Sequence, residues 1–205
     1  YKGISQRLGF AEGLSDDQAR ALAQEGKAIV WIDGGLHANE TLGAQQLGEM
    51  VYQMVSRDDV ETRRFLDDTI ILFVHANPDG HELVSTWYMR SKVPTERTLA
   101  GLPRLYHKYI GHDNNRDSYM LTQVETQYLT RLTYQDWFPE VYLDVHQMGS
   151  SRARIFVPPF KNPPNPNVDP LVWSEVNLLG QAMATRLHEA GKSGVIWGEQ
   201  YSGFW

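Results

Sequence analysis

The chain has 205 residues, 41% hydrophobic and 21% charged, and this length can bury a full core without metal or disulfide crosslinks. Its 19 Lys and Arg against 25 Asp and Glu give a net charge of −6, which argues against nucleic acid or an anionic membrane surface as the main partner. No apolar stretch approaches the ~20 residues of a membrane span, and the absence of cysteine excludes a disulfide framework and a cysteine nucleophile.

The predicted elements alternate between helices and strands. Ser15 and Gln18 form a capping box that begins a helix, and Gly26 ends it. The apolar run 28–33 then predicts a strand buried on both faces. Apolar residues at helical spacing over 44–55 predict a second helix. Similar patterns predict further strands over 69–74, 140–145, 154–157 and 195–197, and further helices over 121–132 and 169–191.

The connections between these elements differ in character. Residues 77–80 (Asn-Pro-Asp-Gly) are a strong turn pattern, residues 90–111 read as an irregular excursion, and residues 158–170 as a loop rich in proline and asparagine. Strands separated by helices of ten or more residues indicate parallel pairing. We therefore predict an α/β fold, a three-layer α/β/α arrangement with a mixed, largely parallel central sheet, in a single domain over residues 1–205.

Polar residues follow three of the predicted strands at their carboxyl ends. His37 and Glu40 follow the first strand, residues 77–80 follow the second, and His146 follows the third. Ligands of open α/β sheets bind at this edge. Two histidines and a glutamate suit zinc and leave a fourth position open for water, although a His-x-x-Glu spacing alone more often marks a capped helix start.

The motifs occur in an order that identifies a family. They are His-x-x-Glu at 37–40, Asn-Pro-Asp-Gly at 77–80, Arg90, Asp-Asn-Asn-Arg at 113–116 and a strand-borne His146. From about residue 31 to 157 this order resembles the zinc metallocarboxypeptidase family, with its carboxypeptidase A-like fold. Asp117 and the stretch 93–111 depart from the digestive members and indicate a divergent bacterial branch, so substrate preference is not carried over.

The resemblance implies a zinc site. His37, Glu40 and His146 look like the zinc ligands, and Zn²⁺ is the expected cofactor. Asp113 is similar to the carboxylate that orients the first zinc histidine.

The resemblance also implies how a peptide is held. Asn115 and Arg116 look like the pair that grips the C-terminal carboxylate of the substrate, which the planar guanidinium meets bidentately. Arg90 resembles the arginine that stabilises the oxyanion. Outside this motif order, both arginines would most often be surface residues in ion pairs.

Two residues near the same edge keep alternative interpretations. Asp144 shares a strand face with His146, so it can support that histidine, but a buried, hydrogen-bonded structural role fits equally well. We interpret His75 as a hydrogen-bonded wall residue, since the ligand set is complete without it or Asp79.

The glutamate that acts as general base in the family lies well beyond the third ligand. Glu175, Glu189 and Glu199 are the available candidates, and none matches the family motif; Tyr201 is a poor match to the active-site tyrosine. We therefore expect a catalytic domain that is incomplete at its C-terminus, holds zinc and hydrolyses peptides poorly.

The function implied by the resemblance is removal of C-terminal residues from peptides by metal-activated water. The partner is then a peptide with a free C-terminal carboxylate. Two alternatives remain: a zinc-dependent amidase or deacylase of small acylamino acids, and a non-catalytic peptide-binding module on the same fold. The family implies a secreted or periplasmic protein whose leader is not part of this chain.

Overall fold

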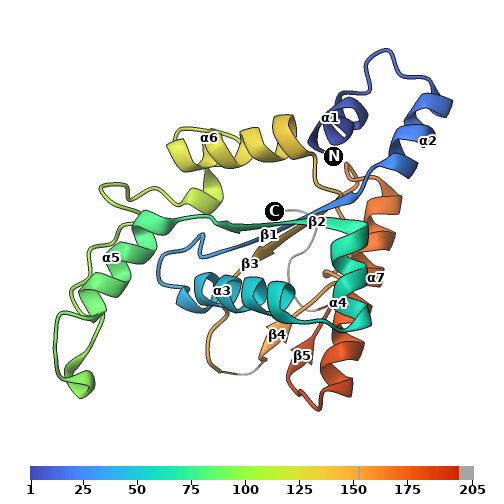
Figure 1. Ribbon diagram of the computed structural model, residues 1–205. Helices are drawn as coiled ribbons and strands as arrows, with labels where there is room; N and C mark the ends of the chain where they lie inside the picture. Colours follow the sequence, from blue (N-terminus) through green and yellow to red (C-terminus); the bar gives the residue numbers. More distant parts are fainter. Residues whose placement is uncertain (152, 199–205) are drawn as a thin grey trace. The chain divides into compact units, whose positions relative to one another are not determined.

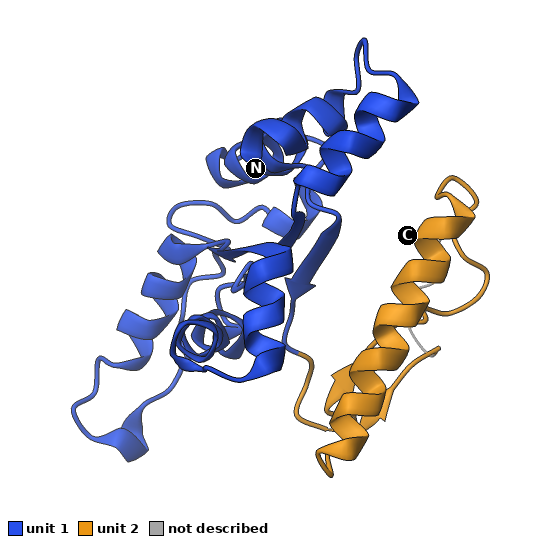
Figure 2. Cartoon of the chain, turned by 45° about the vertical axis from the view of Figure 1, so that its right-hand side comes forward, with its two compact units in different colours: residues 1–147 blue, residues 148–205 orange. Residues whose placement is uncertain are grey.

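A computed structural model describes residues 1–151 and 153–198. The chain divides into two compact units, Tyr1–Gln147 and Met148–Trp205 (Figure 2). The first unit contains every zinc-ligand candidate. The single domain over residues 1–205 stays a prediction.

The first unit is built on a parallel sheet of three strands in the order β2-β1-β3 (Figure 1). The strands are β1 (Ala28–Gly34), β2 (Thr69–His75) and β3 (Val141–Val145). The central strand β1 is well buried, and its residues Ile29 and Trp31 are only 1% exposed. This is typical of an apolar strand covered on both faces. The predicted largely parallel sheet is confirmed.

Helices lie on both faces of this sheet, which confirms the predicted α/β fold. Helices α3 and α4 lie on one face, and α1 and α6 lie on the other (Figure 1). The capping box of Ser15 and Gln18 begins α2 as predicted. The helices of this unit are α1 (Lys2–Phe10), α2 (Asp16–Glu25), α3 (Thr41–Ser56), α4 (Val60–Asp68), α5 (Pro78–Tyr88) and α6 (Val124–Arg131), with short helical turns η1 (Pro94–Glu96), η2 (Asn114–Arg116) and η3 (Leu132–Trp137).

Helices α1, α4 and α5 are missing from the predicted elements. The prediction of a turn at residues 77–80 is wrong, because these residues begin α5. The Asn77 side chain accepts a hydrogen bond from the backbone of Gly80 (2.9 Å), and Pro78 occupies the first helical position. Asparagine and proline favour a turn and a helix start for the same physical reasons, so the pattern alone did not separate the two.

The second unit contains a pair of short parallel strands and a long helix. Strands β4 (Ile155–Phe156) and β5 (Val195–Ile196) pair with each other. Helix α7 (Pro170–Glu189) begins as predicted, with the Asp169 carboxylate accepting from the backbone of Leu171 (2.8 Å).

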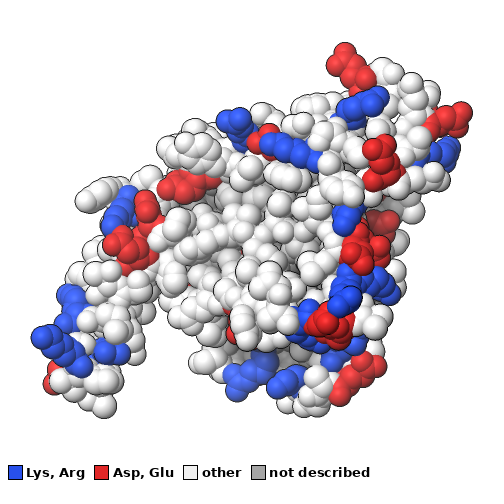
Figure 3. Space-filling model, viewed as in Figure 1, with Lys and Arg blue, Asp and Glu red and all other residues white. Residues whose placement is uncertain are grey.

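Charged side chains of both signs are interspersed over the described part of the face drawn in Figure 3. Within residues 1–151 and 153–198, the helices are too short or too polar to span a membrane.

Candidate metal centre

The zinc-ligand candidates meet where the chain changes direction across the sheet. From β1 the chain crosses to β2 through α3 and α4 on one face, and it later reaches β3 through α6 on the other face (Figure 1). The connections therefore diverge between β1 and β3, and in open α/β sheets ligands bind beyond the carboxyl ends of the strands at such a point. His37 and Glu40 follow β1, and His146 follows β3.

Two glycines bring α3 close to the end of β1. A side chain on Gly34 would place its Cβ 2.3 Å from the carbonyl oxygen of Gly43 in α3. Gly35 has a φ of +75°, in the left-handed region that favours glycine. This tight connection leads into His37 and sets Glu40 immediately before the first turn of α3.

The carboxylate of Glu40 lies between the two imidazoles. His37 Nδ1 is 2.9 Å from Glu40 Oε1, and His146 Nδ1 is 3.0 Å from Glu40 Oε2. One ligand atom from each of the three residues lies within 4.8 Å of the other two. All three side chains are partly exposed, so an ion has access to them. The structure thus brings together the three residues predicted to bind zinc.

The other ring nitrogen of each histidine meets a carboxylate. His37 Nε2 lies 3.2 Å from Asp113 Oδ1, and His146 Nε2 lies 2.9 Å from Asp144 Oδ2. When Nε2–H donates to these carboxylates, both Nδ1 lone pairs point toward Glu40, which is the arrangement that metal-binding histidines use. The contact expected between Asp113 and His37 is present, and Asp144 supports His146 in the same way.

The electrostatics of the cluster favour a positive charge at its centre. Hydrogen bonds to Asp144 and Glu40 raise the pKa of His146 to about 10, and the hydrogen bond to Glu40 also raises the pKa of His37. Although burial opposes it, the two histidines hold the pKa of Glu40 well below its usual range. A divalent cation supplies the same charge and displaces the protons. The donor set therefore fits zinc.

A buried aspartate that the sequence analysis did not single out lies behind Asp144. Asp33 on β1 is 1% exposed and lies opposite Asp144 in the register of the sheet. Its Oδ2 accepts hydrogen bonds from Trp31 Nε1 (2.6 Å) and the Tyr142 hydroxyl (2.9 Å). Burial and the charge of Asp144 raise the pKa of Asp33. In the sequence, the one sign of this role is that Asp33 is the only charged residue of the otherwise apolar run 28–33.

One oxygen of each aspartate lacks a hydrogen-bond donor among the described residues. These atoms are Oδ1 of Asp33 and Oδ1 of Asp144, and both are buried. A proton held by Asp33 and donated to Asp144 satisfies both carboxyl groups. The support of His146 therefore extends into the core of the sheet.

Two buried asparagines hold the loop that carries His37. The Nδ2 groups of Asn77 (3.0 Å) and Asn114 (2.6 Å) both donate to the backbone carbonyl of Leu36. Asn77 also donates to the carbonyl of Tyr106 (2.6 Å). The Asn-Pro-Asp-Gly motif is thus structural, since its asparagine anchors two loops and caps a helix.

The segment predicted to hold the substrate carboxylate is tied to the His37 side of the cluster. The backbone of Asn115 donates to Asp113 Oδ1 (2.8 Å), and Asp113 contacts His37. Arg116 is exposed on the same turn, with one guanidinium nitrogen donating to the carbonyl of Asn115 (2.9 Å).

Asp117 follows directly and explains one departure from the family pattern. It is fully buried and accepts hydrogen bonds from the backbone and hydroxyl of Thr122, the backbone of Gln123 and the hydroxyl of Thr126. Although burial opposes it, these hydrogen bonds hold the pKa of Asp117 well below its usual range. Asp117 fastens the turn that carries Arg116 to the start of α6.

Arg90 lies outside the cluster. It follows α5, an 11-residue helix about 16 Å long that begins beside Asn77. Its guanidinium stacks on the Trp87 ring (3.5 Å) and donates to the Trp87 carbonyl (3.1 Å). The structure thus places Arg90 at the opposite end of α5 from the metal-ligand candidates, and its role at an oxyanion stays a prediction.

His75 is a wall residue, but it is not hydrogen-bonded as we had interpreted it. Its Nε2 is buried without a partner among the described residues. The ring packs on Gly35 and lies edge-on to His81, with the ring centroids 5.1 Å apart. Burial lowers the pKa of His75, so this ring is neutral and serves as packing.

A cavity of about 400 Å³ opens beside the cluster. His37, Asn39 and Glu40 line it on one side, and residues 102–106 line it on another, including Arg104. A space of this size holds a small ligand or part of a peptide. Residues 102–106 belong to the stretch predicted as an irregular excursion, and the sequence motifs assign no role to Arg104.

The model of one protein family, described as zinc carboxypeptidase, matches residues 13–189. The chain belongs to the zinc carboxypeptidase family. The resemblance drawn from the motif order is therefore confirmed, and the family consists of zinc-binding hydrolases of the metalloprotease class. A comparison with curated proteins found no match.

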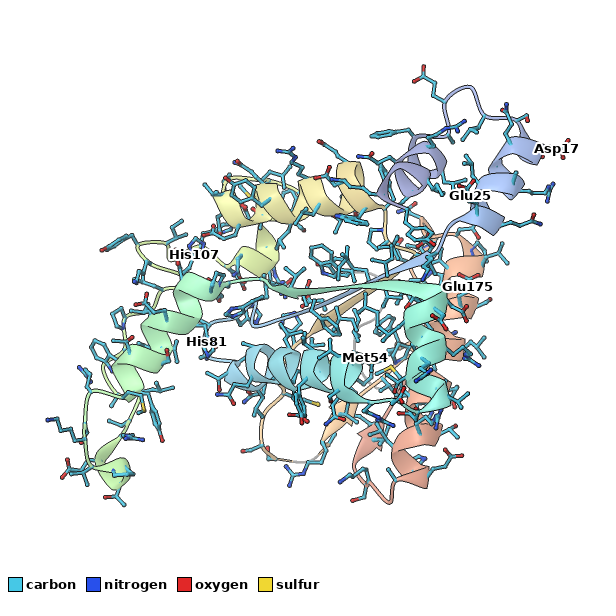
Figure 4. The ribbon with its side chains drawn as sticks, viewed as in Figure 1. Asp17, Glu25, Met54, His81, His107 and Glu175 are labelled. Carbon is cyan, nitrogen blue, oxygen red and sulfur yellow. The ribbon has the colours of Figure 1, made fainter. Side chains whose placement is uncertain are left out.

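The general-base candidates of this family member lie outside the first unit. Glu175 (Figure 4) and Glu189 lie on α7 of the second unit. Glu199 and Tyr201 lie outside the described residues.

Proposed function

We propose that this chain binds one zinc ion through His37, Glu40 and His146 and acts on peptides that have a free C-terminal carboxylate, removing the last residue. The observation that carries the proposal is the convergence of these three ligands from two strand ends, with a carboxylate on the outer nitrogen of each histidine. Zinc in such a site polarises a carbonyl and lowers the pKa of bound water to about 7.

The residues of the chain have separate tasks in this proposal. Asp113 and Asp144 hold the two imidazoles with Nδ1 directed at the ion. Asn115 and Arg116, next to Asp113 on η2, take the substrate carboxylate, because a guanidinium binds a carboxylate through two parallel hydrogen bonds.

Zinc binding is the first test. Elemental analysis of the purified chain after zinc reconstitution and dialysis should give about one zinc per molecule. A preparation that retains no divalent metal would remove the ligand set.

Substrate binding is the second test. The zinc-loaded chain should bind a short peptide with a free C-terminus at least tenfold more tightly than its C-terminal amide, as measured by calorimetry. Arg116→Gln should abolish this difference, while Arg20→Gln, on the surface of α2, should preserve it. Equal affinity of the native chain for both peptides would contradict carboxylate recognition.

Hydrolysis is followed in the same samples by mass spectrometry. Loss of the last residue supports a carboxypeptidase, cleavage of N-acylamino acids in place of peptides supports the amidase alternative, and binding without cleavage supports a peptide-binding module.

A further inference from the structure

The cavity beside the cluster contains a positive charge that the metal centre does not use. Arg104 lines it together with the ligand candidates His37 and Glu40. Arg104 and Arg7 are the two arginines of the described residues whose guanidinium groups form no hydrogen bond, ion pair or ring contact with another described residue.

The carboxylates of the metal centre are already engaged. Glu40 is held between His37 and His146, and Asp113 contacts His37 and accepts from the backbone of Asn115. Among the described residues, no carboxylate forms an ion pair with Arg104. Arg104 is exposed and lines the cavity, so its five N–H donors are accessible to a ligand.

The wall that carries Arg104 is fixed to the same scaffold as the ligand loop. Asn77 donates both to the carbonyl of Leu36, the residue before His37, and to the carbonyl of Tyr106. The next residue, His107 (Figure 4), is 2% exposed, and its Nε2 lies 2.6 Å from Gln123 Oε1. The backbone of Arg104 is thus held beside the cluster before any ligand binds, which lowers the entropy lost on binding.

We propose that Arg104 forms an anion subsite of this cavity and selects peptides with an acidic side chain on one of the two residues that flank the scissile bond. The inference rests on the proposed function, because it takes the substrate to be a peptide beside the metal. A carboxylate side chain completes the hydrogen bonds of the guanidinium, whereas a neutral amide of the same shape lacks the charge.

The test compares peptides that differ only in charge. Two acetylated tetrapeptides of alanine carry Glu at the last or the penultimate position, and each has a partner with Gln there. Affinities for the zinc-loaded chain are measured by calorimetry, and cleavage by mass spectrometry. We expect the native chain to bind at least one Glu peptide roughly tenfold or more tightly than its Gln partner.

Three variants assign this preference to the residue. Arg104→Gln should abolish it, Arg104→Lys should retain part of it, and Arg7→Gln should leave it unchanged. Arg7 is the matched control, because it lines a separate cavity of about 370 Å³ with residues of α1. Zinc content should be the same in all of these proteins.

The outcomes separate this inference from the proposed function. Binding of Glu and Gln peptides with equal affinity overturns the anion subsite alone. A preference for Glu that survives in Arg104→Gln also overturns it, and so does an equal loss of affinity for both peptides in that variant. A native chain that binds zinc but none of the peptides overturns both proposals, whereas selective binding supports the subsite whether the bound peptide is cleaved quickly or slowly.

Discussion

The two histidine sides of the metal centre are supported by different parts of the structure. On the His37 side, the carboxylate is Asp113, which comes from a turn distant in sequence. On the His146 side, the carboxylate is Asp144, two residues away on the same strand, backed by Asp33 in the centre of the sheet. One side is held by loop anchors and the other by strand register, so changes in loops and in the core should affect the two ligands differently.

Removal of either histidine should have the largest effect. His37→Ala and His146→Ala each leave two ligands from the chain, so we expect zinc retention to fall from about one ion per molecule to nearly none. Elemental analysis after dialysis measures it. His81→Ala is the control, since His81 is not among the clustered residues. Full retention in either ligand variant would count against its assignment.

Removal of one supporting charge should weaken zinc binding without abolishing it. We expect Asp113→Asn and Asp144→Asn each to reduce zinc affinity about 10- to 100-fold, because a neutral amide orients and polarises the imidazole less well. The effect of Asp144→Asn should be the larger, since its contact is 2.9 Å against 3.2 Å for Asp113. Competition with a fluorescent zinc chelator measures both. A larger loss of zinc affinity in Asp113→Asn than in Asp144→Asn would show that the loop side contributes more to zinc binding.

Asp117→Asn should destabilise the loop side without touching a ligand. The buried carboxylate accepts several hydrogen bonds, so we expect the free energy of unfolding to fall by about 2 kcal/mol. The lowered pKa of Asp117 means that its contribution is present above about pH 4, the unfolded value, and is lost as the pH falls. Denaturant unfolding at pH 7 and pH 3 should therefore show the difference between variant and native protein shrinking with acid.

Asp33→Asn should have the smallest effect on the free energy of unfolding, and its pH dependence should be opposite to that of Asp117→Asn. The raised pKa of Asp33 means that its contribution is present below about pH 4 and is lost as the pH rises through the folded value. Asparagine keeps a neutral donor toward Asp144, so we expect a change within about 1 kcal/mol at pH 5. Relative to the native protein, the variant should gain stability between pH 5 and pH 8. A flat difference would contradict the shared proton.

The sequence predicted the parts of this site that consist of short motifs. His37 and Glu40 stand three residues apart, and the capping box and apolar strand before them place the pair at a strand end. His146 follows its own strand in the same way. Family resemblance supplied Asp113. Local pattern and motif order were sufficient for these residues because the relevant neighbours are near in sequence or named by the motif.

The missed parts depend on pairing between distant segments. Asp33 and Asp144 meet only because β1 and β3 pair in one particular register, and no local pattern reports a register. Arg104 lines the cavity because Asn77 holds the loop that carries it, through a hydrogen bond to the carbonyl of Tyr106. Helix α4 was missed because its nine residues present few apolar positions, and Asp59 at its cap was the only strong sign.

The double anchor at Asn77 has a consequence for how this fold can diverge. One side chain joins the strand-end loop to Tyr106, so everything between α5 and that contact is a closed excursion whose base is pinned. Lengthening such a loop costs little, because the entropy of closure grows only slowly with the number of residues. Relatives can therefore exchange the exposed tip around η1 for longer or shorter versions and acquire new surface chemistry while the ligand geometry stays the same.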